Sequence, residues 1–171
     1  MACVLAGLAL NVDPSVIQET LDQFKGLPHR LEWVRCIRGV DFYNDSKATN
    51  VDAAVRSVNS FERPIILIAG GRHKGGHYSP LVRASRGKVR KAIFLGESKH
   101  LLAQSFREVI AWAYADDMAE AVSQAFASAA PRDVILLAPA CSSFDMFSDY
   151  AHRGQVFREV VKRLENGNQQ G

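Results

Sequence analysis

Three side chains with complementary chemistry stand at alternate positions in FYNDSKATNVDA, residues 42–53. Asp45 supplies a carboxylate, Lys47 an ammonium group and Thr49 a hydroxyl, between an apolar run typical of a strand and an alanine-rich run typical of a helix. Asp45 can accept hydrogen bonds from ribose hydroxyls, Lys47 can stabilise phosphates, and Thr49 can donate to a carboxylate. A purely structural interpretation also stands: Asp45 can cap a turn, and Thr49 with Asn50 can cap the following helix.

A second polar segment, GGRHKGG at residues 70–76, places Lys74 among glycines. A lysine there can reach a carboxylate or a phosphate without steric cost from its neighbours. The segment lacks the GxxxxGK[ST] spacing with which backbone amides hold phosphates, and the chain contains no GxGxxG. Lys74 is therefore a candidate anion ligand, with a solvated loop lysine as the alternative.

The third polar segment, CSSFD at residues 141–145, is expected to open a helix with Ser142 and Ser143 in its first turn. Free amides at a helix N-terminus bind anions and serine hydroxyls add donors, although a simple N-cap is the more common use of serine there. Arg30, which begins the strand-rich region, is either a structural arginine or a clamp on phosphates across a domain boundary.

The histidines and cysteines lack the spacing of a metal site. There is no HExxH and no CxxC pair, so we expect no metal bound by this chain alone and free thiols in a reducing cytosol. The residues are His29, His73, His77, His100, His152, Cys3, Cys36 and Cys141.

The composition is that of an ordinary soluble globular protein. The 171 residues are 47% hydrophobic and 23% charged, with a net charge of +3 that favours neither nucleic acid nor a membrane as a partner. The apolar opening MACVLAGLAL is too short for a membrane span and has no basic segment of a signal peptide, so a cytoplasmic location is expected. The basic run RASRGKVRK, residues 83–91, is interpreted as a solvated surface rather than a polyanion patch.

Hydrophobic periodicity and turn residues divide the chain into two helices followed by alternating strands and helices. Asp13 and Pro14 mark the start of the second helix. Helices are expected at 2–10, 14–24 and 50–59, in a short stretch that opens at Ser79 and Pro80, and at 98–106, 118–130 and 153–165. Strands are expected at 30–37, 40–45, 64–71, 91–96, 109–114 and 133–140. The helix at residues 2–10 is expected to be buried and to be the end of a preceding domain.

This alternation predicts an α/β fold: a Rossmann-like doubly wound sheet, mostly parallel with one antiparallel edge strand, and helices on both faces. The antiparallel pair is the two strands that flank Arg38 and Gly39. Ligands of such sheets bind beyond the carboxyl ends of the strands, so the three polar segments are expected to converge there.

Four segments resemble the C-terminal domain of the Mur ligases, in particular the members that add D-glutamate. They follow the order and spacing of that family's GLPHR, NDSKATN, AGG…KG and SPACASFD motifs. The segments are GLPHRLEWV (26–34), FYNDSKATNVDA (42–53), IILIAGGRHKGGHYSPL (65–81) and LLAPACSSFDMFSDYAHRGQVF (136–157). Two positions depart from the usual pattern: Ser142 stands where the family usually has alanine, and Tyr150 where it often has phenylalanine.

The resemblance implies an ATP- and Mg²⁺-dependent amide synthesis in peptidoglycan precursor formation. ATP would phosphorylate the alanyl carboxylate of UDP-N-acetylmuramoyl-L-alanine, and the amine of D-glutamate would attack the acyl phosphate. Carried over by position, the implied nucleotide contacts are Arg30, Asp45 and the catalytic Lys47, and the implied D-glutamate contacts are Thr49, Lys74, Ser143, Phe144 and Tyr150.

The family's P-loop and magnesium ligands belong to its central ATPase domain and are not in this sequence. Residues 1–27 are therefore expected to be helices of that central domain and residues 28–171 the Mur ligase C-terminal domain, a fragment that is monomeric and inactive alone. A stand-alone binding or scaffolding module derived from this domain remains an alternative.

Overall fold

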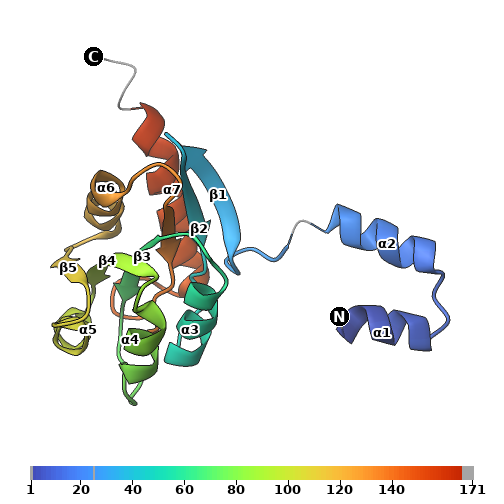
Figure 1. Cartoon of the computed structure of the whole chain (residues 1–171), viewed down its shortest axis with the longest axis horizontal. Helices are drawn as coiled ribbons and strands as arrows, with labels where there is room; N and C mark the ends of the chain where they lie inside the picture. The colour runs from blue at the N-terminus through green and yellow to red at the C-terminus, as the bar shows by residue number, and fades with distance from the viewer. Residues whose placement is uncertain (1, 25, 167–171) are drawn as a thin grey trace.

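A sheet of six strands forms the centre of the part of the chain described by the computed structural model, residues 2–24 and 26–166 (Figure 1). The strand order is β1-β2-β6-β3-β4-β5, and all neighbouring strands are parallel except β1 and β2. The strands are β1 (Glu32–Ile37), β2 (Val40–Asn44), β3 (Ile65–Gly70), β4 (Val89–Leu95), β5 (Ala111–Tyr114) and β6 (Val134–Leu137). The predicted mostly parallel sheet with one antiparallel edge strand is confirmed.

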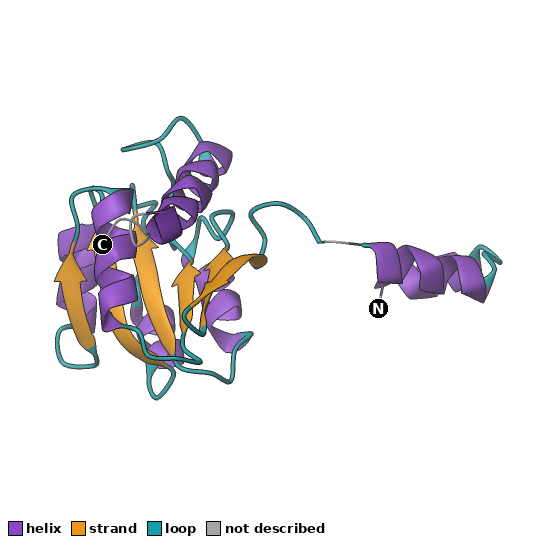
Figure 2. Ribbon diagram, turned by 90° about the horizontal axis from the view of Figure 1, so that it is seen from above, coloured by secondary structure: helices purple, strands orange, loops and turns teal. Residues whose placement is uncertain are grey.

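Helices cover both faces of this sheet, as Figure 2 shows. The helices are α1 (Ala2–Ala9), α2 (Pro14–Gln23), α3 (Val51–Asn59), α4 (Ser79–Ser85), α5 (Lys99–Phe106), α6 (Met118–Ser128) and α7 (Tyr150–Asn166). Alternate residues of β3 point to opposite faces: Ile65 and Leu67 pack with α3, α4 and α5, whereas Ile66 and Ile68 pack with α6 and α7. Every residue of β3 is buried, which explains its uninterrupted apolar sequence.

The connection between β1 and β2 is the predicted two-residue turn. Arg38 and Gly39 have φ angles of 52° and 78°, the left-handed pair that matches the twist of an antiparallel hairpin. Several predicted boundaries differ from the observed ones, and two of them differ by three residues. β6 ends at Leu137 rather than residue 140, because Pro139 has no amide proton and Ala140 has a φ of 58°. The last helix begins at Tyr150 rather than residue 153.

Helices α1 and α2 stand away from the α/β body in Figure 1. The predicted cap of α2 is confirmed, because the Asp13 carboxylate accepts from the Ser15 amide at 2.8 Å. The prediction that the first helix is buried was wrong for this chain: Leu5 is 62% exposed, and neither helix has a buried residue. The physical reason is that α1 has α2 beside it and lies off the sheet (Figure 1). No helix within residues 2–24 and 26–166 is long and apolar enough to cross a membrane.

Candidate functional site

Three polar loops follow the carboxyl ends of neighbouring parallel strands. We name them by their central residues: the Asp45 loop (45–50) after β2, the Lys74 loop (71–78) after β3 and the Ser143 loop (138–149) after β6. Because β6 lies between β2 and β3, the Ser143 loop is between the other two.

Backbone hydrogen bonds join the three loops. The Ala140 amide donates to the Ala48 carbonyl at 2.9 Å, which joins the Ser143 and Asp45 loops. The Arg72 amide donates to the Ser142 carbonyl at 3.0 Å, and the Ser142 amide donates back to the Arg72 carbonyl at 3.1 Å. The predicted convergence of the three polar segments is therefore confirmed.

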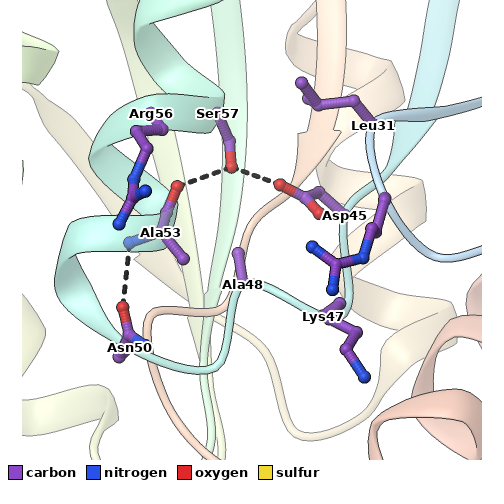
Figure 3. Close-up of a pocket in the computed structure, with 9 residues that line it drawn as sticks. Leu31, Asp45, Lys47, Ala48, Asn50, Ala53, Arg56 and Ser57 are labelled. Atoms are coloured by element: carbon purple, nitrogen blue, oxygen red, sulfur yellow. Dashed lines mark hydrogen bonds between the residues drawn. The ribbon is translucent and has the colours of Figure 1, made fainter. Parts of the chain in front are cut away.

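A pocket of about 380 Å³ lies between the Asp45 loop and helix α3 (Figure 3). It brings together the three residues predicted to contact a nucleotide, Arg30, Asp45 and Lys47. The full lining is Arg30, Leu31, Asp45, Lys47, Ala48, Asn50, Ala53, Arg56 and Ser57. With three cationic side chains and one carboxylate, the pocket suits a polyanionic ligand.

Asp45 is held firmly within this pocket. The Ser57 hydroxyl donates to its carboxylate and also lies 2.9 Å from the Ala53 carbonyl (Figure 3). Burial raises the pKa of Asp45 above its ordinary value, and the Ser57 hydroxyl, the Leu31 backbone and the charge of Arg30 offset only part of that effect. The carboxylate is thus oriented before any ligand arrives.

Lys47 lies against a residue predicted for the other ligand. Its ammonium nitrogen is 3.9 Å from the centre of the Tyr150 ring, within cation–π range. Its backbone amide donates to the His29 carbonyl at 3.1 Å, which fixes where the side chain begins. Tyr150, the first residue of α7, therefore links the pocket beside α3 to the Ser143 loop.

Three polar residues of the pocket, Asn50, Arg56 and Ser57, were not predicted as pocket residues by the sequence analysis. Arg56 lines the wall formed by α3, and Asn50 both lines the pocket and caps α3 through a 2.9 Å hydrogen bond from the Ala53 amide (Figure 3). The signal was present in the helical spacing, since Asn50, Ala53 and Ser57 recur at intervals of three and four.

None of the residues predicted to contact a dicarboxylate ligand lines this pocket. Lys74 is exposed near the tip of its loop, and Phe144 is 62% exposed. Ser143 is 2% exposed, and Thr49 follows Ala48 at the junction of the Asp45 and Ser143 loops. The chain therefore presents them on three joined loops.

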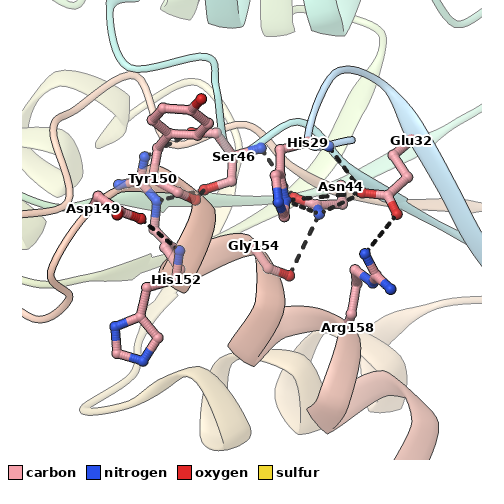
Figure 4. Close-up of polar contacts among 10 residues, drawn as sticks. His29, Glu32, Asn44, Ser46, Asp149, Tyr150, His152, Gly154 and Arg158 are labelled. Atoms are coloured by element: carbon pink, nitrogen blue, oxygen red, sulfur yellow. Dashed lines mark hydrogen bonds and ion pairs between the residues drawn. The ribbon is translucent and has the colours of Figure 1, made fainter. Parts of the chain in front are cut away.

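The prediction that CSSFD opens a helix was wrong. Ser142 is held extended by its bridge to Arg72, and the Ser143 carbonyl accepts from the Phe147 amide at 2.8 Å in a single turn. Asp149 caps α7 instead, because its carboxylate accepts from the His152 amide at 2.7 Å (Figure 4). Ser142 and Ser143 thus have no helix N-terminus behind them.

The sequence analysis also missed Arg153 of α7, whose buried side chain joins the Asp45 loop to the Ser143 loop. Its side chain is 2% exposed and donates to the Ser46 hydroxyl at 2.9 Å, the Ser46 carbonyl at 2.8 Å and the Cys141 carbonyl at 3.2 Å. Burial lowers the pKa of Arg153 to about 10, so the guanidinium remains charged at neutral pH. A buried positive charge therefore lies against the Asp45 and Ser143 loops, where it favours the binding of a nearby anion.

A second polar network fixes the segment that enters β1 (Figure 4). The Asn44 amide donates to Glu32 at 3.0 Å, Arg158 pairs with the same carboxylate at 3.2 Å, and Asn44 lies 3.0 Å from His29 Nδ1. Gly154 permits this approach, because a Cβ there would overlap the His29 ring. Arg30, which follows His29, is thereby held at the pocket.

The donor groups in the described part of the chain do not suit a magnesium ion. Within residues 2–24 and 26–166, no group of three or more His, Cys, Asp or Glu side chains is placed to hold a metal. The pocket beside α3 contains one carboxylate and three cations, which is the wrong charge for a divalent cation.

Comparison with known proteins assigns the chain to a family. The sequence pattern of the Mur ligase, glutamate ligase domain matches residues 29–141, so the chain belongs to the Mur ligase family. Among its relatives are the UDP-N-acetylmuramoylalanine--D-glutamate ligases of Caldicellulosiruptor saccharolyticus and Salinibacter ruber. They are 43% and 44% identical over 166 and 165 residues, and each alignment covers 96% of this chain. The chain spans only 37% and 36% of their lengths.

Solved structures share the fold at low identity. UDP-N-acetylmuramate-alanine ligase MurC from Thermotoga maritima superposes with a TM-score of 0.68 at 14% identity, over 96% of this chain and 36% of that one. Bifunctional folylpolyglutamate synthase/dihydrofolate synthase from Yersinia pestis gives 0.63 at 18%, over 90% and 34%. These likenesses support the α/β architecture and carry no further assignment.

Proposed function

We propose that this chain is the D-glutamate-binding and nucleotide-contacting domain of an ATP-dependent ligase. The ligase would add D-glutamate to UDP-N-acetylmuramoyl-L-alanine through an acyl phosphate. The observation that carries this proposal is the joining of two sets of anion-binding groups, the pocket around Asp45 and the loops of Lys74 and Ser143, by direct backbone hydrogen bonds. The names of the relatives supply the substrate class.

The nucleotide half of the proposal rests on charge and shape. Arg30 and Lys47 supply positive charge for phosphates, and the oriented Asp45 carboxylate can accept hydrogen bonds from ribose hydroxyls. Lys47 would also stabilise the negative charge that develops on the phosphoryl group during transfer, since an ammonium placed there in advance needs no reorganisation.

The D-glutamate half rests on matching two carboxylates. Lys74 would pair with one of them, and the hydroxyls of Thr49 and Ser143 would donate hydrogen bonds. The buried charge of Arg153 below the loops favours the same ligand, and the exposed Phe144 ring with Tyr150 would exclude water from one side. Tyr150, which touches Lys47, would place the two ligands close together.

Magnesium would neutralise phosphate charge in such a reaction, and the described residues contain no ligand set for it. We propose that another part of a longer protein supplies these ligands. Helices α1 and α2 would belong to that other part, with residues 28–171 as the domain proper. Their exposed leucines support this division, because apolar side chains of a helix are normally covered.

A titration of the isotope-labelled chain tests the proposal. D-glutamate should shift the amide resonances of the Lys74 and Ser143 loops, whereas ADP should shift those of the Asp45 loop and of Arg56. L-glutamate, with the same charge and size, is the control and should bind more weakly. Equal responses to D- and L-glutamate, or D-glutamate shifts confined to residues outside the three loops, would contradict the proposal.

A further inference from the structure

A buried chain of polar side chains lies beneath the Lys74 loop. The Tyr78 hydroxyl is 2.9 Å from His73 Nδ1 and 3.1 Å from Cys141 Sγ, and the Ser98 hydroxyl lies 3.1 Å from the same sulfur. Tyr78 is 5% exposed, Cys141 is fully buried and Ser98 is 1% exposed. None of these four residues was singled out as a ligand contact by the sequence analysis.

This series of polar side chains connects the Lys74 loop to the Ser143 loop. Tyr78 ends the Lys74 loop, and His73, whose ring packs against Tyr78 at 5.3 Å, directly precedes Lys74. Cys141 directly precedes Ser142 and Ser143. The Tyr78 hydroxyl therefore joins the base of the Lys74 loop to Cys141, which precedes Ser142 and Ser143.

The tip of the Lys74 loop has little else to hold it. Gly75 and Gly76 have φ angles of 85° and 87°, and a Cβ at either would meet nothing within 4 Å. The other side of the loop base is fixed by the reciprocal backbone bonds of Arg72 with Ser142. The placement of Lys74 thus depends on the base of its loop, where the Tyr78 hydroxyl holds one side and the Arg72 bridge, with the Arg72–Glu97 ion pair, holds the other.

The Tyr78 hydroxyl and the Cys141 thiol stay uncharged at neutral pH. Burial raises the pKa of Tyr78 and also that of Cys141, so the hydroxyl and the thiol keep their protons and can each donate one hydrogen bond. These two neutral groups do not compete with Lys74 for the charge of an anionic ligand.

We infer that Tyr78 is a positioning residue whose hydroxyl holds the Lys74 loop against the Ser142–Ser143 segment, so that one dicarboxylate can contact both. The part that concerns the ligand rests on the proposed function. The coupling of the loops does not, since it is a property of the free chain. Phenylalanine at this position would keep the ring and remove only the connection.

Hydrogen exchange in the ligand-free chain tests the coupling, with Tyr78→Phe compared with Tyr114→Phe. Tyr114 is a matched control, because its hydroxyl lies 3.1 Å from His100 Nδ1 in the same kind of Tyr–His pair, away from the loops. Loss of one buried hydrogen bond should speed exchange of the Arg72 and Ser142 amides about fivefold to tenfold relative to the core amide of Leu67. Tyr114→Phe should leave this ratio unchanged.

Binding then tests the consequence. Tyr78→Phe should weaken D-glutamate binding about fivefold and leave ADP binding within about twofold, because a loosened loop must be ordered when the ligand binds. If Tyr78→Phe does not fold, His73→Ala serves in its place, because it alters a partly exposed ring and leaves the core intact. It should also speed amide exchange and weaken D-glutamate binding. An exchange ratio equal to that of Tyr114→Phe would overturn the inference and leave the proposed function intact. If the exchange ratio rises but D-glutamate binds elsewhere, the coupling stands and the proposed function fails.

Discussion

Replacement of Arg153 by methionine should destabilise the α/β domain by about 3 kcal/mol. The guanidinium makes hydrogen bonds to the Ser46 hydroxyl, the Ser46 carbonyl and the Cys141 carbonyl, each between 2.8 and 3.2 Å. A net loss of about 1 kcal/mol for each bond gives this figure. Methionine fills much of the volume, so the measured change reports the polar contacts rather than a cavity.

Urea unfolding followed by tryptophan fluorescence measures this change. Both tryptophans, Trp33 and Trp112, lie in the α/β domain, so helices α1 and α2 do not contribute to the signal. Arg158→Met on the same helix is the control. Arg158 is 30% exposed and pairs with Glu32 at 3.2 Å, so its loss should cost less than about 1 kcal/mol. An Arg153→Met chain as stable as the wild type would refute the reasoning, because the buried charge would then cost as much as its bonds return.

Three further predictions follow from the loops and the pocket. Gly71→Ala should lower the unfolding free energy by about 2 kcal/mol or more, because its φ is 130° and a Cβ would overlap the Ser142 carbonyl; unchanged stability would contradict the close approach. Burial raises the pKa of Asp45 in the folded chain above 3.8, so the folded chain binds this proton more tightly than the unfolded chain. The contribution of Asp45 to the free energy of unfolding therefore falls as the pH rises from the unfolded pKa through the folded pKa. The stability of the wild type relative to Asp45→Asn, measured by urea unfolding, should therefore fall as the pH rises from about 4 to about 7, whereas a rise would reverse the sign. Arg56→Ala should weaken ADP binding about threefold to tenfold, and Arg86→Ala, an exposed arginine outside the pocket, should not; calorimetry that finds equal effects would remove Arg56 from the site.

The sheet and the convergence of its polar loops were predictable, because both follow from local pattern. Alternating apolar strands and helices fix a doubly wound sheet, and parallel strands send their following loops to one edge. The pocket residues Arg30, Asp45 and Lys47 were found in this way together with the resemblance to the Mur ligases.

The parts that could not be predicted depend on contacts between distant residues. Nothing around Arg153 marks it as buried, since its partner Ser46 lies 107 residues away in the sequence. Tyr78 and Cys141 are 63 residues apart, so their contact becomes apparent only when β3 and β6 are placed side by side. The CSSFD segment has a local helix signal, but the pairing of Ser142 with Arg72 prevails over it.

The central claim is that Lys47 and Lys74 serve different ligands at one shared edge of the sheet. Steady-state kinetics of the full-length ligase proposed to contain this chain, with each lysine changed to alanine, test it most directly. Lys74→Ala should raise the KM for D-glutamate about tenfold or more and leave the KM for ATP within about twofold, because it removes one carboxylate partner. Lys47→Ala should mainly lower kcat, because its charge acts on the transferring phosphoryl group. An unchanged KM for D-glutamate in Lys74→Ala, together with unchanged turnover in Lys47→Ala, would contradict the account.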